Sequence, residues 1–86
     1  MPTISRFYGI VIWMYFDDHP PPHLHAIYAG QKAVIAIETG AVLRGKIPDR
    51  ALRLVREWTN EHREALADDW ERAQKREPLL PIPPLP

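Results

Sequence analysis

Apolar residues in the first half of the chain recur with the spacing of β-strands. Residues 10–16 are rich in β-branched and aromatic side chains and apolar at both alternating positions, which predicts a strand that is central in its sheet or covered on two faces. Turn sequences at Ala29-Gly30-Gln31 and Thr39-Gly40 separate the apolar runs that follow. We therefore expect three further strands, at residues 23–29, 32–38 and 41–45. Strands joined by such short turns predict an antiparallel meander.

From Pro48 onwards the apolar spacing changes to that of an α-helix. The side of this helix that would face the sheet is formed by Ala51, Leu54, Val55, Trp58, His62, Ala65, Leu66 and Ala73. Pro48 and Asp49 suit the first turn of a helix, and Pro78 ends it after about Arg76. A straight helix of that length would measure roughly 40 Å.

So long a helix would extend beyond a compact domain of this size, whose radius of gyration should be about 12 Å. A bend near Asn60-Glu61 would shorten the helix, but we favour a covered end, where Trp70 contacts the C-terminal tail, a partner protein or a second copy of the chain. The tail, residues 78–86, is proline-rich and should be extended. Its apolar side chains are expected to pack against the domain or a neighbour.

These elements predict an α+β fold, in which an antiparallel β-meander of three to four strands is packed by one long C-terminal helix. Residues 1–77 would form a single α+β domain, and residues 78–86 a proline-rich C-terminal tail. A chain of 86 residues supports one domain that removes ~60–65% of its unfolded surface from water. Its stability should therefore be modest.

Composition argues against several classes of function. The chain has no cysteine, so it has neither disulfides nor a thiolate site, and it has no long apolar run that would span a membrane. We expect a cytoplasmic protein of bacterial type with no membrane association. The formal net charge is zero, which argues against a strong general attraction to nucleic acid, although residues 44–58 are locally basic.

The segment Asp17-Asp18-His19-Pro20-Pro21-Pro22-His23-Leu24-His25 concentrates the residues that carry chemistry. It holds three of the four histidines around three prolines, which stiffen the backbone. His23 and His25 lie two residues apart on a predicted strand, so their side chains project from the same face and could bind one metal ion. Asp18 and His19, across the proline turn, could supply further ligands of a divalent metal. The simpler alternative is a set of loop hydrogen bonds with no metal.

The same histidines also suit a metal-independent ribonuclease. One imidazole would take the proton from a ribose hydroxyl and another would protonate the leaving oxygen, roles open to His19, His23 and His25. Arginine or lysine would stabilise the charge on the phosphate. The candidates for these contacts are Arg6, Arg44 and Lys46, with Tyr8 as an auxiliary donor.

A basic strip lies on the predicted helix, on the side opposite to the apolar one, and consists of Arg53, Arg56, Asn60 and Arg63. Arg53 and Arg56 could contact phosphate or a partner, whereas an ordinary solvated helix face explains the same pattern and is the more common case. His62 lies within the apolar side of this helix. We expect a hydrogen-bonded core role for it, unless it meets His23 or His25 across the interface.

Three stretches of the sequence resemble a known family. They are Met1-Pro2-Thr3-Ile4-Ser5-Arg6-Phe7-Tyr8-Gly9-Ile10, the Asp18-His19 pair with Pro21-Pro22-His23-Leu24-His25-Ala26, and Arg50-Ala51-Leu52-Arg53-Leu54-Val55-Arg56-Glu57-Trp58. Over nearly its whole length the chain resembles the small bacterial family called domain of unknown function 4160. The resemblance implies one half of a two-gene module of toxin–antitoxin type, encoded beside another small protein.

On this basis the function we expect first is that of a partner-binding component. Its partner would be the small protein of the neighbouring gene, with the histidine loop as a shaped contact surface. The helix end and the tail would form the docking area, either for that partner or for a second copy in a homo-oligomer. A ribonuclease that takes RNA as its partner and a metal-binding module are the two alternatives.

Overall fold

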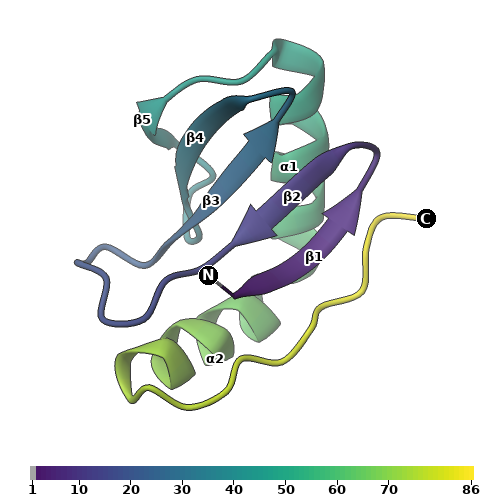
Figure 1. The fold of residues 1–86 in the computed structure, drawn as a ribbon. Coiled ribbons are helices and arrows are strands. Elements are labelled where there is room, and N and C mark those ends of the chain that lie inside the picture. Colours follow the sequence, from purple (N-terminus) through teal and green to yellow (C-terminus); the bar gives the residue numbers. More distant parts are fainter. Residues whose placement is uncertain (1) are drawn as a thin grey trace.

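The computed structural model describes residues 2–86. Within them, five strands are followed by two helices: β1 (Thr3–Phe7), β2 (Ile10–Trp13), β3 (His23–Tyr28), β4 (Gln31–Ala36), β5 (Val42–Gly45), α1 (Asp49–Glu61) and α2 (Arg63–Gln74). The strands form one antiparallel sheet in the order β1-β2-β3-β4-β5, so each strand pairs with its neighbours in sequence. The predicted α+β class and the antiparallel meander are confirmed (Figure 1).

The prediction of three to four strands is wrong, because β1 adds a fifth at the edge of the sheet. Ser5 and Arg6 interrupt the apolar pattern of this segment, so the sequence does not distinguish it from a loop. Tyr8 and Gly9 join β1 to β2 with φ angles of 50° and 80°. Two successive positive φ angles are typical of the tight type I′ turn between antiparallel strands. A Tyr-Gly pair is a weaker signal for this turn than Asn-Gly, so the hairpin is not predicted from the sequence.

The hydrophobic core lies between the sheet and α1. Fully buried side chains such as Leu24 of β3 meet Val55 and Trp58 of α1, and the rings of Phe7 and Trp58 lie 5.3 Å apart. In Figure 1, α1 lies behind the sheet and no helix crosses the face turned to the viewer. Helix α1 therefore covers one face of the sheet, and no helix crosses the other face, beside which the loop after β2 lies.

The prediction of one long helix is also wrong. The chain leaves the helical conformation at His62, with φ −117° and ψ 27°, where α1 ends and α2 begins. A straight helix over residues 49–74 would be about 39 Å long, whereas the longest dimension of the molecule is 33 Å. The bend turns α2 under the end of the sheet, so that Leu66, Trp70 and Ala73 join the core. The alternative of a bend near Asn60-Glu61 is thus the correct one, displaced by one residue.

The tail also covers part of this end of the molecule. The Ile82 N–H donates to the Ile4 carbonyl at 2.8 Å, and Trp58 Nε1 donates to the Pro83 carbonyl at 2.8 Å. Ile82 and Leu85 are buried in the core, while Leu80 is exposed. The proline-rich segment is therefore an extended strap that packs along β1 and α1 (Figure 1).

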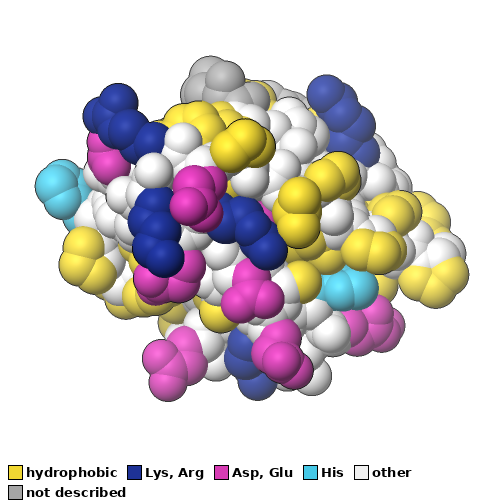
Figure 2. Space-filling model, turned by 90° about the horizontal axis from the view of Figure 1, so that it is seen from below, with side chains coloured by type: hydrophobic (Ala, Val, Ile, Leu, Met, Phe, Trp, Pro, Cys, Tyr) yellow, Lys and Arg dark blue, Asp and Glu magenta, His cyan; other side chains and the backbone are white. Residues whose placement is uncertain are grey.

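The underside of the molecule, formed by α2 and the tail, has a mixed surface. Figure 2 shows acidic and basic side chains interspersed among separate apolar patches on this face. None of the described helices has the length and apolar character needed to cross a membrane.

Candidate functional site

The two histidines of β3 lie on the sheet face opposite to α1. In the strand registers, His25 is the partner of Trp13 in β2 and of Val34 in β4, whereas Leu24, between the histidines, points into the core. Side chains two residues apart on a strand share a face. His23 and His25 therefore stand side by side, with their ring centroids 5.3 Å apart. This arrangement confirms the geometric prediction made from their spacing.

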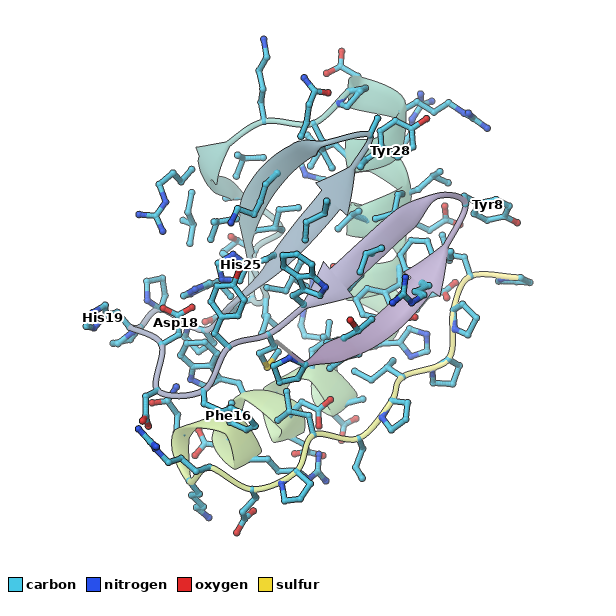
Figure 3. The ribbon with its side chains drawn as sticks, in the orientation of Figure 1. Tyr8, Phe16, Asp18, His19, His25 and Tyr28 are labelled. Atoms are coloured by element: carbon cyan, nitrogen blue, oxygen red, sulfur yellow. The ribbon has the colours of Figure 1, made fainter. Side chains whose placement is uncertain are left out.

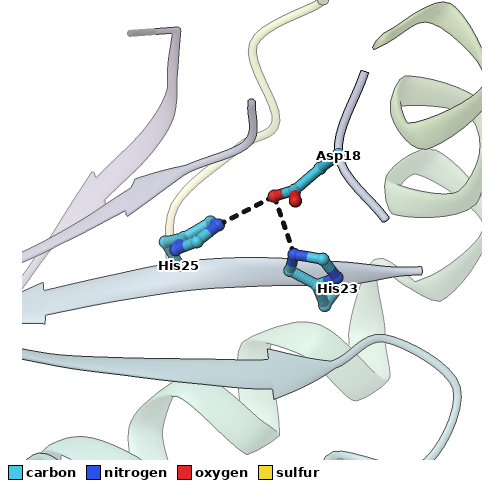
Figure 4. Close-up of side chains that lie close together, drawn as sticks. All are labelled: Asp18, His23 and His25. Carbon is cyan, nitrogen blue, oxygen red and sulfur yellow. Dashed lines mark hydrogen bonds and ion pairs between the residues drawn. The ribbon is translucent and has the colours of Figure 1, made fainter. Parts of the chain in front are cut away.

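The carboxylate of Asp18 lies between the two imidazoles. Its Oδ2 atom is 2.8 Å from His23 Nε2 and 3.2 Å from His25 Nε2, and Figure 4 marks both contacts with dashed lines. The other carboxylate oxygen, Oδ1, accepts the backbone N–H of His19 at 2.9 Å. We call Asp18, His23 and His25 the Asp–His–His cluster.

The end of α2 holds the loop that carries Asp18. Asp17, immediately before it, has φ 54°, a left-handed conformation that aspartate tolerates better than most residues. Its carboxylate pairs with the Arg76 side chain, and its N–H donates to the Ala73 carbonyl at 3.3 Å. Gln74 Nε2 donates to the Asp18 carbonyl at 3.1 Å. The position of Asp18 thus depends on contacts with a helix more than fifty residues later in the chain.

The ring of His23 has a hydrogen-bond acceptor at each nitrogen. Nδ1 lies 2.8 Å from the Pro21 carbonyl and Nε2 lies 2.8 Å from Asp18 Oδ2. A neutral imidazole has a single N–H, so it can donate to one of these acceptors but not to both. In the neutral ring, the second nitrogen therefore turns its lone pair towards an oxygen, unless a cation lies between the two atoms.

His25 is enclosed more completely. Its ring stacks on that of Tyr15, with centroids 4.1 Å apart, and only 4% of its surface is exposed. Burial lowers the pKa of His25 below its ordinary 6.5, against the hydrogen bond with Asp18, which raises the pKa. The neutral ring places one nitrogen against Asp18, and Nδ1 has no hydrogen-bond partner among the described residues.

Asp18 is ionised at neutral pH. Burial raises the pKa of its carboxyl, but the hydrogen bonds from His25, from the His19 backbone N–H and from His23 outweigh that effect and hold the pKa below 3.8. The cluster thus joins one carboxylate to two imidazoles whose ring orientations are fixed by neighbouring groups.

This geometry fits the ligand set of a divalent transition ion. One ligand atom from each of the three residues lies within 4.8 Å of the other two. Bonds of about 2.0–2.2 Å around a tetrahedral ion would separate ligand atoms by about 3.3–3.5 Å, close to the 3.2 Å between Asp18 and His25. Such an ion would require Asp18 and His23 to move apart by about 0.5 Å. The contact between His23 Nδ1 and a backbone carbonyl is the outer hydrogen bond usual for a metal-bound histidine.

A pocket of about 240 Å³ opens beside the cluster. Its lining is formed by Asp18, His19, Pro20, Pro21, His23, Val34, Leu43 and Arg44. The pocket therefore brings two members of the cluster together with one exposed guanidinium. His25 is not part of its wall, because Tyr15 covers that ring.

His19 stands apart from the cluster although it was predicted with it. Its side chain is exposed and points away from Asp18 and His25 in Figure 3. It contributes its backbone N–H to Asp18, and its side chain lines the pocket. The structure therefore brings Asp18, His23 and His25 together and leaves the His19 ring outside.

The other residues proposed for ribonuclease chemistry are dispersed. Tyr8 lies at the opposite end of the sheet, near Tyr28, where its hydroxyl donates to the Pro86 carbonyl (Figure 3). Arg6 is exposed on edge strand β1 and Lys46 is exposed after β5, outside the pocket lining. Arg44 is thus the one predicted phosphate contact that lies in the pocket beside His23.

The helical arginines lie on the far side of the sheet. Arg53 and Arg56 belong to α1, which packs against the face opposite to His23 and His25. Arg56 Nε donates to the Gly40 carbonyl at 2.8 Å, which fastens the β4–β5 turn to the helix. His62 is half-buried at the bend, with its ring 5.6 Å from that of Trp58. No described hydrogen bond or ring contact joins it to the cluster.

Tyr15 and Trp70 are the site residues that the sequence does not reveal. Tyr15 lies at the end of the apolar run 10–16 and Trp70 was expected to contact the tail or a partner, yet Tyr15 stacks on His25 and Trp70 packs on His23 with ring centroids 5.1 Å apart. The position of Tyr15, three residues before Asp18, is a weak signal for its role. Nothing in the sequence links Trp70 to a histidine that precedes it by more than forty residues.

Comparison with known proteins agrees with the resemblance drawn from the proline–histidine loop and the first half of the helix, whereas residues 1–8 of the opening segment lie outside the matched range. No curated protein and no solved structure matches this chain. The family described as Domain of unknown function (DUF4160) matches residues 9–71, which run from the β1–β2 turn into α2 and include the whole Asp–His–His cluster. The chain belongs to this family.

Proposed function

We propose that this protein binds a divalent transition-metal ion through Asp18, His23 and His25. The observation that supports the proposal is that one carboxylate oxygen lies within 2.8–3.2 Å of two imidazole nitrogens. Two histidines and one carboxylate form a recurrent ligand set for zinc and iron(II), with the remaining positions left to water or substrate. The geometry thus favours the metal-binding alternative over the partner-binding role that we expected first from the sequence.

The two hydrogen-bond acceptors beside the His23 ring favour a bound ion over a cluster held by hydrogen bonds alone. With a metal at His23 Nε2, the single N–H of the neutral ring is at Nδ1 and donates to the Pro21 carbonyl, so both nitrogens are satisfied. The ion would equally use the Nε2 lone pair of His25, which otherwise requires a proton there. Without an ion, the single N–H of a neutral His23 ring serves one of the two oxygens and the other oxygen faces a nitrogen lone pair.

Metal titration tests the proposal directly. The purified chain is stripped with a chelator, and Zn²⁺, Fe²⁺, Co²⁺ and Mn²⁺ are titrated by calorimetry, with native mass spectrometry for stoichiometry. We expect one ion per chain. Replacing one ligand, in His23→Gln or His25→Gln, should weaken binding by at least about 100-fold, the upper end of the loss seen for outer partners of metal ligands.

His19→Gln is the matched control, because His19 is adjacent in sequence but its ring lies outside the cluster. Its metal affinity should stay within about threefold of the parent value. A second readout is thermal stability, since an ion held at 100 times its dissociation constant should stabilise the folded chain by about 2.7 kcal/mol. The proposal fails if the chain binds no ion, or if the double variant His23→Gln/His25→Gln binds as well as the parent.

A second candidate is the partner-binding component of a toxin–antitoxin-like two-gene module in the bacterial cytoplasm. Its support is the sheet face without a helix, where Trp13 and Ile27 are half-buried and Leu43 is exposed. Exposed apolar groups of this kind are common at protein interfaces. Co-purification with the small protein of the neighbouring gene tests this role. Trp13→Lys should abolish the complex, whereas Arg53→Glu on the opposite side should not.

The metal-independent ribonuclease stays a prediction from the sequence. Its structural support is the pocket that joins His19, His23 and Arg44. Incubation of the metal-free chain with RNA tests it, because cleavage that persists in His23→Ala/His25→Ala would contradict the assignment of these bases and acids.

A further inference from the structure

The pocket beside the Asp–His–His cluster has the composition of a site for a small anion. Its wall contains Asp18 and His23, two of the proposed metal ligands, and Arg44. The inference that follows rests on the proposed function, since it assigns a ligand to the pocket onto which the proposed metal site opens.

Strand register fixes Arg44 on the same side of the sheet as the cluster. Val34 of β4 is the partner of His25 on one side and of Arg44 of β5 on the other. The three residues therefore form one row across the sheet, and neighbouring strands are about 4.8 Å apart. The Arg44 backbone is then about 10 Å from that of His25, a distance that a flexible arginine side chain and a small bound anion can bridge together.

Gly45 allows β5 to approach β4 at this point. It has φ +73°, and a Cβ atom there would lie 2.2 Å from the Lys32 carbonyl oxygen. The Lys46 N–H donates to the same oxygen at 3.1 Å. The position of Arg44 is therefore set by a local backbone arrangement that other residues do not permit.

The charges of the pocket call for an anionic ligand. No carboxylate lies within ion-pair distance of Arg44 among residues 2–86. With a divalent ion on the cluster, the ion and Arg44 supply three positive charges against the single negative charge of Asp18. Arginine and a metal ion are the usual pair of groups that hold the oxygens of a phosphate.

The remaining lining limits the size and shape of the ligand. Pro20, Pro21, Val34 and Leu43 provide apolar walls, and the volume of about 240 Å³ is below the roughly 300–1,000 Å³ of pockets for drug-sized molecules. The space suits a phosphate group with a small organic substituent, whose apolar part would contact the prolines and Leu43.

We propose that this pocket binds a small phosphate monoester, with its oxygens shared between the metal ion on Asp18, His23 and His25 and the guanidinium of Arg44. Binding of the metal and of the phosphate should then be coupled. By thermodynamic linkage, each should tighten the other by the same factor, of about tenfold for a typical coupling free energy.

The experiment is a calorimetric titration of the zinc-loaded chain and of the metal-free chain, each with inorganic phosphate and with methyl phosphate. Phosphate should bind the zinc-loaded chain about tenfold more tightly than the metal-free chain. Arg44→Gln should weaken phosphate binding about tenfold or more and leave zinc affinity within threefold. Arg53→Gln, which removes an equal charge on the other side of the sheet, is the matched control and should behave as the parent.

The outcomes separate this inference from the metal proposal. A chain that binds no zinc overturns the proposed function and the inference with it. A chain that binds zinc normally, but binds phosphate equally well with and without Arg44, overturns the inference alone. Acetate is the third probe, and acetate binding as tight as that of phosphate would contradict a site built for a phosphate ester.

Discussion

Trp70, in the second turn of α2, packs on the ring of His23 in β3, with the ring centroids 5.1 Å apart. The contact is long-range in sequence and joins the helix beyond the bend to the candidate metal site. The bend at His62 makes this contact possible, because a straight continuation of α1 would carry Trp70 away from the sheet. Gln74 at the end of α2 and Arg76 in the turn that follows it also hold the Asp18 loop.

Replacement of Trp70 should therefore affect both stability and metal binding. Trp70→Ala removes a nearly fully buried side chain, which should cost about 3–5 kcal/mol of unfolding free energy. Loss of the ring that supports His23 should also weaken metal binding by about 10–100-fold, the range found for residues that orient metal ligands. Urea denaturation and metal titration below the melting temperature measure the two effects. Trp70→Phe keeps an aromatic ring and should retain most of both properties, so equal loss in the two variants would contradict the orienting role.

The tail should be needed for a stable fold. Removal of residues 78–86 removes the buried side chains of Ile82 and Leu85, and the burial of each stabilises the fold by about 1.5–3 kcal/mol. It also leaves the Trp58 Nε1 donor without its acceptor, which costs about 1–3 kcal/mol more. The free energy of unfolding of a small domain is only about 5–15 kcal/mol in total. The shortened chain should therefore be largely unfolded or melt far below the parent in a thermal scan.

Leu80→Ser is the control for the tail, since Leu80 is 53% exposed and should change stability by less than about 0.5 kcal/mol. Ile82→Ala should cost about 2–5 kcal/mol by itself. A shortened chain as stable as the parent would show that the strap contributes nothing to the fold.

Much of the candidate site could be predicted because its three ligands are local in sequence. The i, i+2 relation of His23 and His25 follows from strand geometry alone, and the proline loop brings Asp18 back within reach of them. The parts that could not be predicted are those that act at long range. His62 is neither glycine nor proline, so no local signal ends α1 there, and the destination of Trp70 depends on that bend.

The edge strand shows the same limit in the fold. β1 was not predicted because Ser5 and Arg6 interrupt its apolar pattern, and its strand conformation depends on pairing with β2 and on the hydrogen bond from Ile82 of the tail. Pairing across the sheet is a tertiary effect that overrides weak local preference. His19 illustrates the converse case, because its sequence neighbours suggest a ligand while its ring points to solvent.

The stability of the metal-free chain should fall as the pH is lowered. The pKa of His25 is below 6.5 in the folded chain, so the unfolded chain binds the proton more readily once the pH falls through 6.5. Folding is then opposed, with a slope of up to about 1.4 kcal/mol per pH unit. Asp18 adds a second loss below pH 3.8, since its folded pKa is also lowered. Above pH 6.5 neither group contributes a slope.

Urea denaturation in the presence of a chelator, from pH 8 to pH 5, measures this dependence. In His25→Gln the contribution of that imidazole is absent, so the decline between pH 6.5 and pH 5 should be shallower than in the parent. His19→Gln, which removes an exposed histidine, should keep the parental slope. Identical curves for the parent and His25→Gln would contradict the assigned burial of a neutral ring.

Gly45 and Gly30 offer a matched pair of substitutions. Both have positive φ angles, +73° and +80°, but a Cβ at Gly45 would lie 2.2 Å from the Lys32 carbonyl oxygen whereas nothing lies within 4 Å of one at Gly30. Gly30→Ala should therefore cost about 1 kcal/mol from backbone strain alone. Gly45→Ala should cost at least about 2–3 kcal/mol, because β5 must shift. Chemical denaturation measures both, and equal costs would contradict the close approach at Gly45.

The three proposed ligands come from a run of only eight residues, while the side chains that hold them in place come from α2 and the turn after it, far along the chain. A synthetic peptide of the loop and the start of β3 would thus contain every donor atom but none of its support from Trp70, Gln74 and Arg76. The ratio between the zinc affinities of that peptide and of the folded domain would express, as a free energy, how much of the binding comes from preorganisation rather than from the donors themselves.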